Sequence, residues 1–213
     1  RKRGTEARQV VTEIEEQGGS AFAVQADIAD EVQVVRMFQQ LDEQDGALRV
    51  LVNNAGILFT QCRVEDLDAE RIQRVFATNV LGTFICCREA VKRMSTTHGG
   101  QGGAIVNVSS AASRLGAPNE YVDYAASKGA MDTLTKGLSL EVAAEGIRVN
   151  SVRPGLIYTE MHADGGEPGR VDRVASSLPM GRGGQAKEVA EAILWLASDA
   201  ASYVTGTFID AAG

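Results

Sequence analysis

The chain has 213 residues, of which 23% are charged and 44% hydrophobic, which is typical of one soluble globular domain with a sizeable core. Its net charge of −7 and the lack of a basic or aromatic-rich stripe argue against a nucleic-acid partner. No apolar run approaches the roughly 18 residues of a membrane helix and no signal peptide is apparent, so we expect no membrane association.

The cysteines and histidines indicate a compartment and argue against a metal site. Cys62, Cys86 and Cys87 are odd in number and two of them are adjacent, which favours free thiols in a reducing cytosol over disulfides. The histidines, His98 and His162, stand far apart, and the cysteine spacing suits no metal. We therefore expect a cytoplasmic protein without a bound metal.

Helical and extended patterns alternate along the chain. We predict a helix over residues 6–17 that ends at Gly18-Gly19, followed by a short buried strand over 21–26. The next patterns predict helices and strands in turn, at 30–44, 49–53, 68–95, 104–109, 122–145, 147–152, 186–197 and 206–210. Apolar strands separated by helices are typical of a parallel sheet with right-handed crossovers, so the predicted fold class is a doubly wound α/β domain.

Polar and small residues interrupt the apolar pattern at the carboxyl ends of the predicted strands. They are Asp27, residues 53–56, Ser109-Ser110 and Pro154-Gly155. Ligands of doubly wound sheets bind outside this edge of the sheet. The sequence therefore predicts a binding site there.

The stretch YVDYAASK at 121–128 places two tyrosines and a lysine on one predicted helix. Lys128 lies one turn, about 5–6 Å, from Tyr124 and two turns, about 10.5 Å of rise, from Tyr121. A nearby cation favours the phenolate and lowers the pKa of a tyrosine, which makes it a better acid or base near neutral pH. Distance therefore favours Tyr124 as the reactive residue, although an exposed Tyr–Lys pair on a helix surface has the same spacing.

A pair of serines closes the strand that precedes this helix. Ser110 lies fourteen residues before Tyr124, which leaves room for a loop that folds back beside the helix. A hydroxyl at this place can hold a substrate carbonyl oxygen while the tyrosine donates or takes its proton. The alternative for paired serines at a strand end is ordinary turn formation.

Five short motifs follow one another along the chain: NNAG at 53–56, ATNVLGTF around Asn79, IVNVSS ending at Ser110, YAASK at 124–128 and RPGLIYT at 153–159. In this order and at these intervals they resemble the short-chain dehydrogenase/reductases, over nearly the whole chain. The stretches GEPGRVDRV and YVTGTFIDAAG resemble the glucose-dehydrogenase-like and 3-oxoacyl-reductase-like members. The resemblance implies one Rossmann-like domain over residues 1–213.

The resemblance also implies the roles of four catalytic residues. Tyr124 would be the general acid/base, and Lys128 would lower its pKa and bind the nicotinamide ribose. Ser110 would orient the substrate oxygen; it fits the family spacing better than Ser109, although the loop GAPNEYVD is one residue longer than the family spacing implies. Asn79 would hold a water that links Lys128 to solvent, whereas without the motif it would be read as a polar kink in a long helix.

A second set of residues would bind the cofactor. Asp27 and Ile28 would contact the adenine edge, and the NNAG segment would flank the adenosine. Residues after the strand at 147–152 would contact the nicotinamide. Together with Tyr124 and Lys128, the implied cofactor contacts are Asp27, Ile28, Asn53, Ala55, Gly56, Pro154, Gly155, Ile157 and Thr159.

The family's glycine-rich phosphate loop is missing from the printed sequence. A Rossmann-type unit begins with a strand, a glycine-rich turn and a helix. The cluster HGGQGG at 98–103 precedes a strand, and GRGG at 181–184 precedes a helix, so we interpret both as connecting turns. We expect the domain to be N-terminally incomplete, with the native polypeptide continuing upstream by roughly 35 residues, by analogy with the family.

The basic stretch RKRG at 1–4 would fall after the family's second strand, where arginine or lysine can neutralise a 2′-phosphate. It favours NADP over NAD, although a solvated basic terminus is the simpler interpretation. A loop over about 160–184 would cover the substrate, with Tyr121 as a wall of its pocket.

Two functions remain open at this point. The first is an oxidoreductase that interconverts a small-molecule carbonyl and a secondary alcohol with NADP or NAD. The alternative is a non-catalytic dinucleotide-binding or scaffold protein of the same fold. Either would be a homo-oligomer, a tetramer or a dimer, assembled through the helices at 68–95 and 122–145 or through the last strand.

Overall fold

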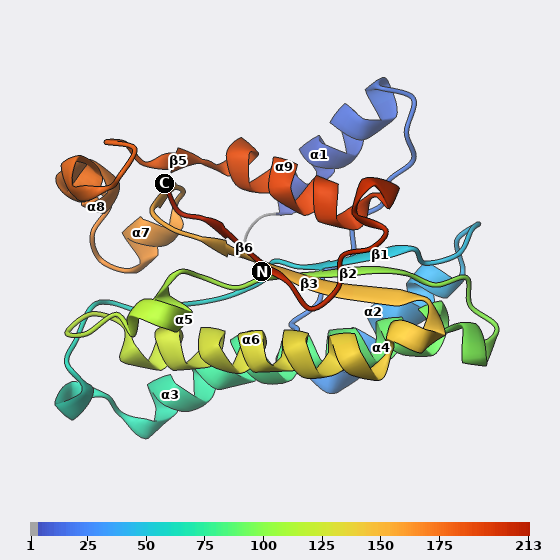
Figure 1. The fold of residues 1–213 in the computed structure, drawn as a ribbon, viewed down its shortest axis with the longest axis horizontal. Coiled ribbons are helices and arrows are strands. Elements are labelled where there is room, and N and C mark those ends of the chain that lie inside the picture. Colours follow the sequence, from blue (N-terminus) through green and yellow to red (C-terminus); the bar gives the residue numbers. More distant parts are fainter. Residues whose placement is uncertain (1–3) are drawn as a thin grey trace.

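A four-stranded parallel sheet forms the centre of the computed structural model, which describes residues 4–213. Its strands run in the order β1, β2, β3, β6 (Figure 1) and comprise Val50–Asn53, Gly103–Val108, Ile147–Pro154 and Phe208–Ala211. The register brings their carboxyl ends to one edge, with Asn53 opposite Asn107 and Pro154 opposite Ala211. The fold is the predicted Rossmann-like doubly wound α/β domain.

Helices cover both faces of this sheet (Figure 1). On one face lie α2 (Glu31–Asp42), α3 (Ala69–Phe76), α4 (Thr83–Met94) and α6 (Val122–Glu141), and on the other lies α9 (Ala186–Ala197). α1 (Gly4–Glu16) lies on the side of α9 and buries none of its residues. These long helices agree with the predicted ones to within a few residues at each end.

The remaining elements are short and were not predicted, because a few residues are too short to show a period. They are α5 (Ala112–Leu115), α7 (Met161–Asp164), α8 (Arg170–Val174), the parallel pair β4 (Ile157–Tyr158) and β5 (Gly184–Gln185), and the 3₁₀ helices η1 (Val64–Asp66), η3 (Thr96–His98), η5 (Ala175–Ser177) and η6 (Asp199–Ala201). A further 3₁₀ helix, η4 (Ala143–Glu145), falls within the predicted helix over 122–145. Pairing of β4 with β5 joins the two ends of the segment at 160–184. This segment is therefore a closed loop with short helices of its own.

The hydrophobic core has one part on each side of the sheet. Side chains of consecutive strand residues point to opposite faces. In β2, Ile105 packs with Phe38 and Met94 under α2 and α4, whereas Val106 packs with Val189 and Leu196 of α9. β2 is thus buried on both faces, as its largely apolar sequence predicts.

The prediction of a strand over residues 21–26 is wrong. The structure has no regular element there, and Phe22 is 46% exposed. A strand forms only beside a neighbour that completes its hydrogen-bond ladder. Among the described residues, β1 pairs with β2 alone, and Val50 and Val52, which lie on one face of β1, are exposed.

The predicted long helix over 68–95 is helical throughout but changes its winding in the middle. Between α3 and α4, the segment η2 (Ala77–Gly82) is a π-helix, a type of turn that often occurs at functional sites. Gly82 allows the helix to pack closely against the backbone of Ile28, since a Cβ added to Gly82 would lie 2.7 Å from the Ile28 carbonyl oxygen. The wide turn carries Asn79 into the interior.

A network of ion pairs around the buried Glu89 carboxylate connects α4 to α2. The Glu89 carboxylate accepts hydrogen bonds from Lys92 Nζ at 2.9 Å and from Arg93 Nη1 at 3.0 Å, and Arg93 also binds Asp42 on α2. Burial alone raises the pKa of Glu89, but hydrogen bonds from Lys92, Arg93 and Arg88 outweigh it and lower the pKa to about 2.

We expect Glu89→Gln to reduce the acid sensitivity of the fold. Because the folded-state pKa is depressed below the ordinary 4.5, the stabilisation is complete above pH 4.5 and is lost as pH falls towards about 2. Urea unfolding followed between about pH 6 and pH 3 should show a smaller decline in free energy for the variant than for the unsubstituted protein. Glu31→Gln, which removes an exposed partner of Arg88, is the control and should leave the slope unchanged.

Candidate active site

Tyr124 and Lys128 lie on the first turns of α6, beside the carboxyl end of β2. Both are buried, with 8% and 3% of their surface exposed. The Lys128 ammonium lies 5.6 Å from the centre of the Tyr124 ring and donates a hydrogen bond to the Val108 carbonyl at 2.7 Å. The helical spacing therefore brings the two side chains together as predicted.

The structure also separates the two serines. Ser110 is hydrogen-bonded to the side chain of Tyr124, and its hydroxyl accepts a hydrogen bond from the backbone N–H of Ala112 at 3.1 Å. Ser109 instead turns inward and donates to the carbonyl of Lys128 at 3.3 Å. Ser110 is thus the hydroxyl that faces Tyr124.

The pKa of Tyr124 moves in the direction opposite to the one that the Tyr–Lys spacing predicts. Burial raises it to about 12, and the hydrogen bond from Ser110 opposes this rise only in part. Burial likewise lowers the pKa of Lys128 to about 8, against the opposing charge of Asp132. The reason is that both groups share a desolvated site and the ammonium points at a backbone carbonyl. The phenol is therefore protonated, as a proton donor must be.

Asn79 joins α6 to the segment after β1. Its Oδ1 accepts from the N–H of Ile57 at 2.8 Å, and its Nδ2 donates to the Ile57 carbonyl at 2.9 Å and to Ser127 Oγ at 3.0 Å. Ser127 in turn donates to the carbonyl of Tyr124 at 2.7 Å. The buried amide thus braces the active-site helix. A Cβ on Gly56 would lie 3.5 Å from both Asn79 Oδ1 and Lys128 Nζ, so these three residues converge.

The predicted cofactor contacts divide into exposed and buried groups. Ala55 and Thr159 are exposed, and Gly56, Pro154 and Gly155 are partly exposed at the same edge of the sheet. These residues have small or compact side chains, and Gly56 lies beside the Lys128 ammonium.

The other predicted contacts have side chains that bind or pack within the protein; Asn53 and Ile157 are buried, whereas Asp27 and Ile28 are partly exposed. Asn53 Nδ2 donates to Asn107 Oδ1 at 2.9 Å and so braces β1 against β2. Ile157 packs in the core under α9, and Ile28 packs against the core of the opposite face. The Asp27 carboxylate accepts from the N–H of Ala29 at 3.1 Å. At Asn53 and Ile157, the backbone rather than the side chain borders the exposed edge.

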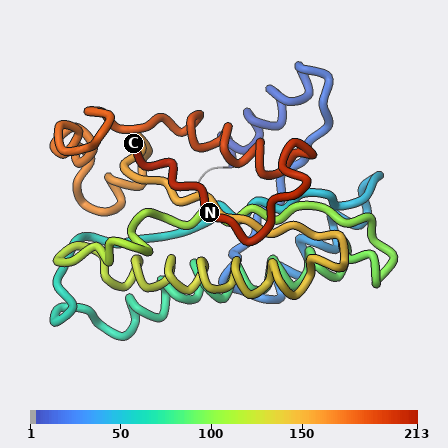
Figure 2. Tube along the Cα trace, in the orientation of Figure 1, coloured from blue at the N-terminus to red at the C-terminus, as the bar shows by residue number. Residues whose placement is uncertain are grey.

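The segment at 160–184 is docked on the loops around 57–62 and 116–121 (Figure 2), and the sequence did not predict these contacts. Gln61 donates to Glu167 at 2.9 Å, and Arg170 donates to Glu120 at 2.5 Å. Tyr121 is buried; its hydroxyl donates to the Gly165 carbonyl at 3.4 Å, and the Arg170 guanidinium lies 5.1 Å above its ring. Tyr121 therefore contacts this segment and not Lys128.

The loop before Tyr121 has an unusual backbone. Ala117 and Asn119 have positive φ values of 44° and 62°, which non-glycine residues seldom adopt. This is the loop GAPNEYVD, in which the spacing of the motifs suggested an additional residue.

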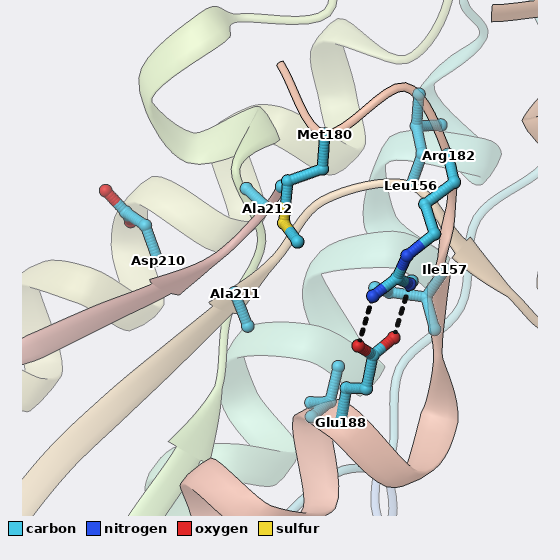
Figure 3. Close-up of a pocket in the computed structure, with 11 residues that line it drawn as sticks. Leu156, Ile157, Met180, Arg182, Glu188, Asp210, Ala211 and Ala212 are labelled. Carbon is cyan, nitrogen blue, oxygen red and sulfur yellow. Dashed lines mark hydrogen bonds and ion pairs between the residues drawn. The ribbon is translucent and has the colours of Figure 1, made fainter. Parts of the chain in front are cut away.

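A cavity of about 230 Å³ lies apart from these residues (Figure 3). It is lined near the end of β6 by Met180, Ala212, Arg182 and Glu188, with a paired hydrogen bond between the last two at 2.6 and 2.8 Å. None of the four predicted catalytic residues lines it. Its lining includes Met180, Arg182 and Gly184, where the chain leaves the segment at 160–184.

The three cysteines are free, and no three His, Cys, Asp or Glu side chains among residues 4–213 could together hold a metal ion. In the part of the chain that the structure describes, no helix is both long and apolar enough to cross a membrane. The basic residues 1–3, on which the preference for NADP rests, lie outside the described residues.

Comparisons with known proteins identify the family of this chain. The family model described as Enoyl-(Acyl carrier protein) reductase matches residues 2–213. The Escherichia coli (strain K12) oxidoreductase YgfF is 72% identical over 207 residues, which cover 97% of this chain and 84% of YgfF. The crystal structure of a short-chain type dehydrogenase/reductase from Mycobacterium marinum superposes with a TM-score of 0.89 at 33% identity, covering 99% of this chain and 82% of that one. The chain belongs to the short-chain dehydrogenase/reductase family.

Members of this family are oxidoreductases that typically use NAD(P), and the resemblance read from the motifs is therefore confirmed. A third relative, 3beta-hydroxysteroid dehydrogenase 1 of Eggerthella lenta, is 40% identical over 207 residues, covering 96% of this chain and 78% of the relative. Like these proteins, this short-chain dehydrogenase/reductase is an enzyme.

Proposed function

We propose that this protein interconverts a carbonyl and a secondary alcohol, with Tyr124 as the general acid/base and NADP as the preferred cofactor. The observation that carries the proposal is a buried, protonated phenol that is hydrogen-bonded to Ser110 and lies one helical turn from a buried ammonium. The nicotinamide supplies or accepts the hydride when it is bound.

The chain's own residues then handle the substrate oxygen and its proton. In the reduction, Ser110 and Tyr124 hold the carbonyl oxygen, and the Tyr124 hydroxyl donates a proton to it as negative charge develops. Lys128 stabilises the resulting phenolate, because a buried ammonium at this distance favours the charged form of the tyrosine. Asn79 keeps α6 and the segment after β1 in register, and it orients a water between Lys128 and solvent.

The cofactor site is proposed on the exposed edge formed by Ala55, Gly56, Pro154, Gly155 and Thr159. At Gly155 a side chain would collide with the chain end, since its Cβ would lie 2.8 Å from Ala212 Cα. Asp27 and Ile28 would border the adenine, and Asn53 and Ile157 would contribute backbone atoms.

Assembly and location belong to the same proposal. Large apolar side chains are exposed on one side of the molecule, on η2, α4 and α6, and they include Leu81, Phe84 and Leu140. An exposed apolar patch of this kind is a common site of protein association. We propose a cytoplasmic homotetramer or homodimer that uses these helices.

The direct test is turnover of a panel of carbonyl compounds by the full native polypeptide, with NADPH and with NADH. The panel contains sugars, 3-oxoacyl thioesters and 3-oxosteroids, because the sequence resembles the first two groups of enzymes and one relative is a hydroxysteroid dehydrogenase. We expect consumption of NADPH with at least one class and slower consumption of NADH. Binding of cofactor without turnover of any of these classes would contradict the proposed reaction.

Neutralising the three basic residues at positions 1–3 tests the cofactor preference. In the triple variant Arg1→Gln, Lys2→Gln, Arg3→Gln, we expect KM for NADPH to rise about tenfold, since a phosphate loses charge-assisted partners. KM for NADH should stay within about twofold, because NADH has no 2′-phosphate. Equal changes for both cofactors would contradict the assignment of these residues to the 2′-phosphate.

A further inference from the structure

Asp132 is a buried carboxylate whose hydrogen-bonding capacity is only half used. It lies on α6, and its side chain is 14% exposed. Its Oδ2 accepts a hydrogen bond from Nε of Arg153 on β3 at 3.0 Å and forms an ion pair with Nη2 of the same guanidinium at 2.9 Å. Its Oδ1 is fully buried and has no hydrogen-bond partner. Such an atom is costly to bury, so it calls for an explanation.

The helix places this carboxylate one turn after Lys128. Residues four apart on a helix lie on the same face, and helical side chains lean towards the N-terminus. Asp132 therefore leans towards the turn that carries Lys128. The unpartnered Oδ1 adds negative potential on this face of α6.

Lys128 is an ammonium without a carboxylate in direct contact. Among the ion pairs of residues 4–213, none includes Lys128, although its side chain is buried. Its polar contacts are the Val108 carbonyl at 2.7 Å and, more distantly, Met131 Sδ at 4.0 Å. Neither carries a formal charge, so a charge that keeps Lys128 protonated must act over a longer distance.

We propose that Asp132 is a positioning residue that acts through Lys128, as the counter-charge that keeps this ammonium protonated at neutral pH. The inference rests on the proposed function, in which Lys128 stabilises the Tyr124 phenolate. Desolvation lowers the pKa of Lys128 to about 8, and the charge of Asp132 acts against this decrease. A neutral lysine could not stabilise a phenolate.

Arg153 offsets part of the Asp132 charge at Lys128. The same guanidinium also faces Asp210 of β6, with 3.7 Å between Nη1 and Oδ1. Asp210 in turn pairs with the exposed Arg114 of α5. Lys136 lies one further turn along α6. From η2 and β2, the groups facing Lys128 are the uncharged Asn79 amide and the Val108 carbonyl.

The test is a direct titration of Lys128 in the full native polypeptide without cofactor or substrate. Lysine labelled with ¹³C at Cε is followed by NMR, and Lys128 is assigned by its absence in Lys128→Arg. We expect Asp132→Asn to lower the pH at which Lys128 titrates by about one unit, and Asp132→Glu to restore it. Asp210→Asn, which removes the second carboxylate facing Arg153, is the matched control and should shift the titration far less.

The same variants should change the pH dependence of catalysis. At about pH 8, a one-unit shift leaves roughly one fifth as much protonated Lys128, so Asp132→Asn should lose about fivefold in kcat, with less loss at pH 6. The titration needs no activity, so it can fail while the proposed reaction holds, or succeed while the reaction fails. An unchanged Lys128 titration in folded Asp132→Asn overturns the inference.

Arg153→Gln provides a second test if Asp132→Asn does not fold. Without the guanidinium, the charge of Asp132 is less neutralised, and we expect Lys128 to titrate at a higher pH than in the unsubstituted protein. A titration that stays the same or moves to lower pH overturns the inference as well.

Discussion

Replacing Tyr124 with phenylalanine should lower kcat by about 10²–10⁴-fold, the usual contribution of a general acid/base. The substitution removes the hydroxyl that is hydrogen-bonded to Ser110 and keeps the buried ring. Binding of NADPH, measured by fluorescence or thermal shift, should be retained because Lys128 and the exposed strand edge remain.

Tyr121→Phe is the matched control for this experiment. It removes a hydroxyl from the same helix start, but that hydroxyl only donates to the Gly165 carbonyl at 3.4 Å. We expect this variant to keep most of the activity. If both substitutions reduce kcat equally, the choice between the two tyrosines is wrong.

Removing the Asp123 carboxylate should cost the fold about 3 kcal/mol, at the lower end of the range for breaking a buried ion pair. Asp123 precedes Tyr124 on α6, and its side chain is 1% exposed. Arg71 of α3 donates to it from Nε at 2.8 Å and to the Thr60 carbonyl at 2.6 Å. In Asp123→Ala, the guanidinium stays largely buried with only the carbonyl as a partner, which is why the effect is large.

Urea unfolding of Asp123→Ala measures this loss, and Glu65→Ala is its control. Glu65 pairs with Arg63, but both side chains are more than half exposed. An exposed pair contributes little, so we expect a change below about 0.5 kcal/mol. Similar losses in the two variants would show that the Arg71–Asp123 pair does not behave as a buried one.

Periodicity was sufficient to predict the long helices and the central strands, because amphipathic spacing and continuous apolar runs are properties of the sequence itself. It did not predict β4, β5, α7 and α8, which are held by contacts between distant residues. The strand expected at 21–26 failed for a related reason. Its apolar residues satisfy the pattern of a strand, but only a neighbouring strand could complete its hydrogen bonds.

In the candidate site too, some features follow from local sequence spacing and others depend on tertiary contacts. The sequence by itself determined which tyrosine lies beside Lys128, since helical spacing fixes that distance within one element. The family spacing had already favoured Ser110 over Ser109, but only the tertiary structure shows that Ser109 turns inward to the Lys128 carbonyl and that Asn79 bonds to Ile57. It also reversed the expected direction of the Tyr124 pKa. Burial depends on every element that packs around a group, and no local spacing contains that information.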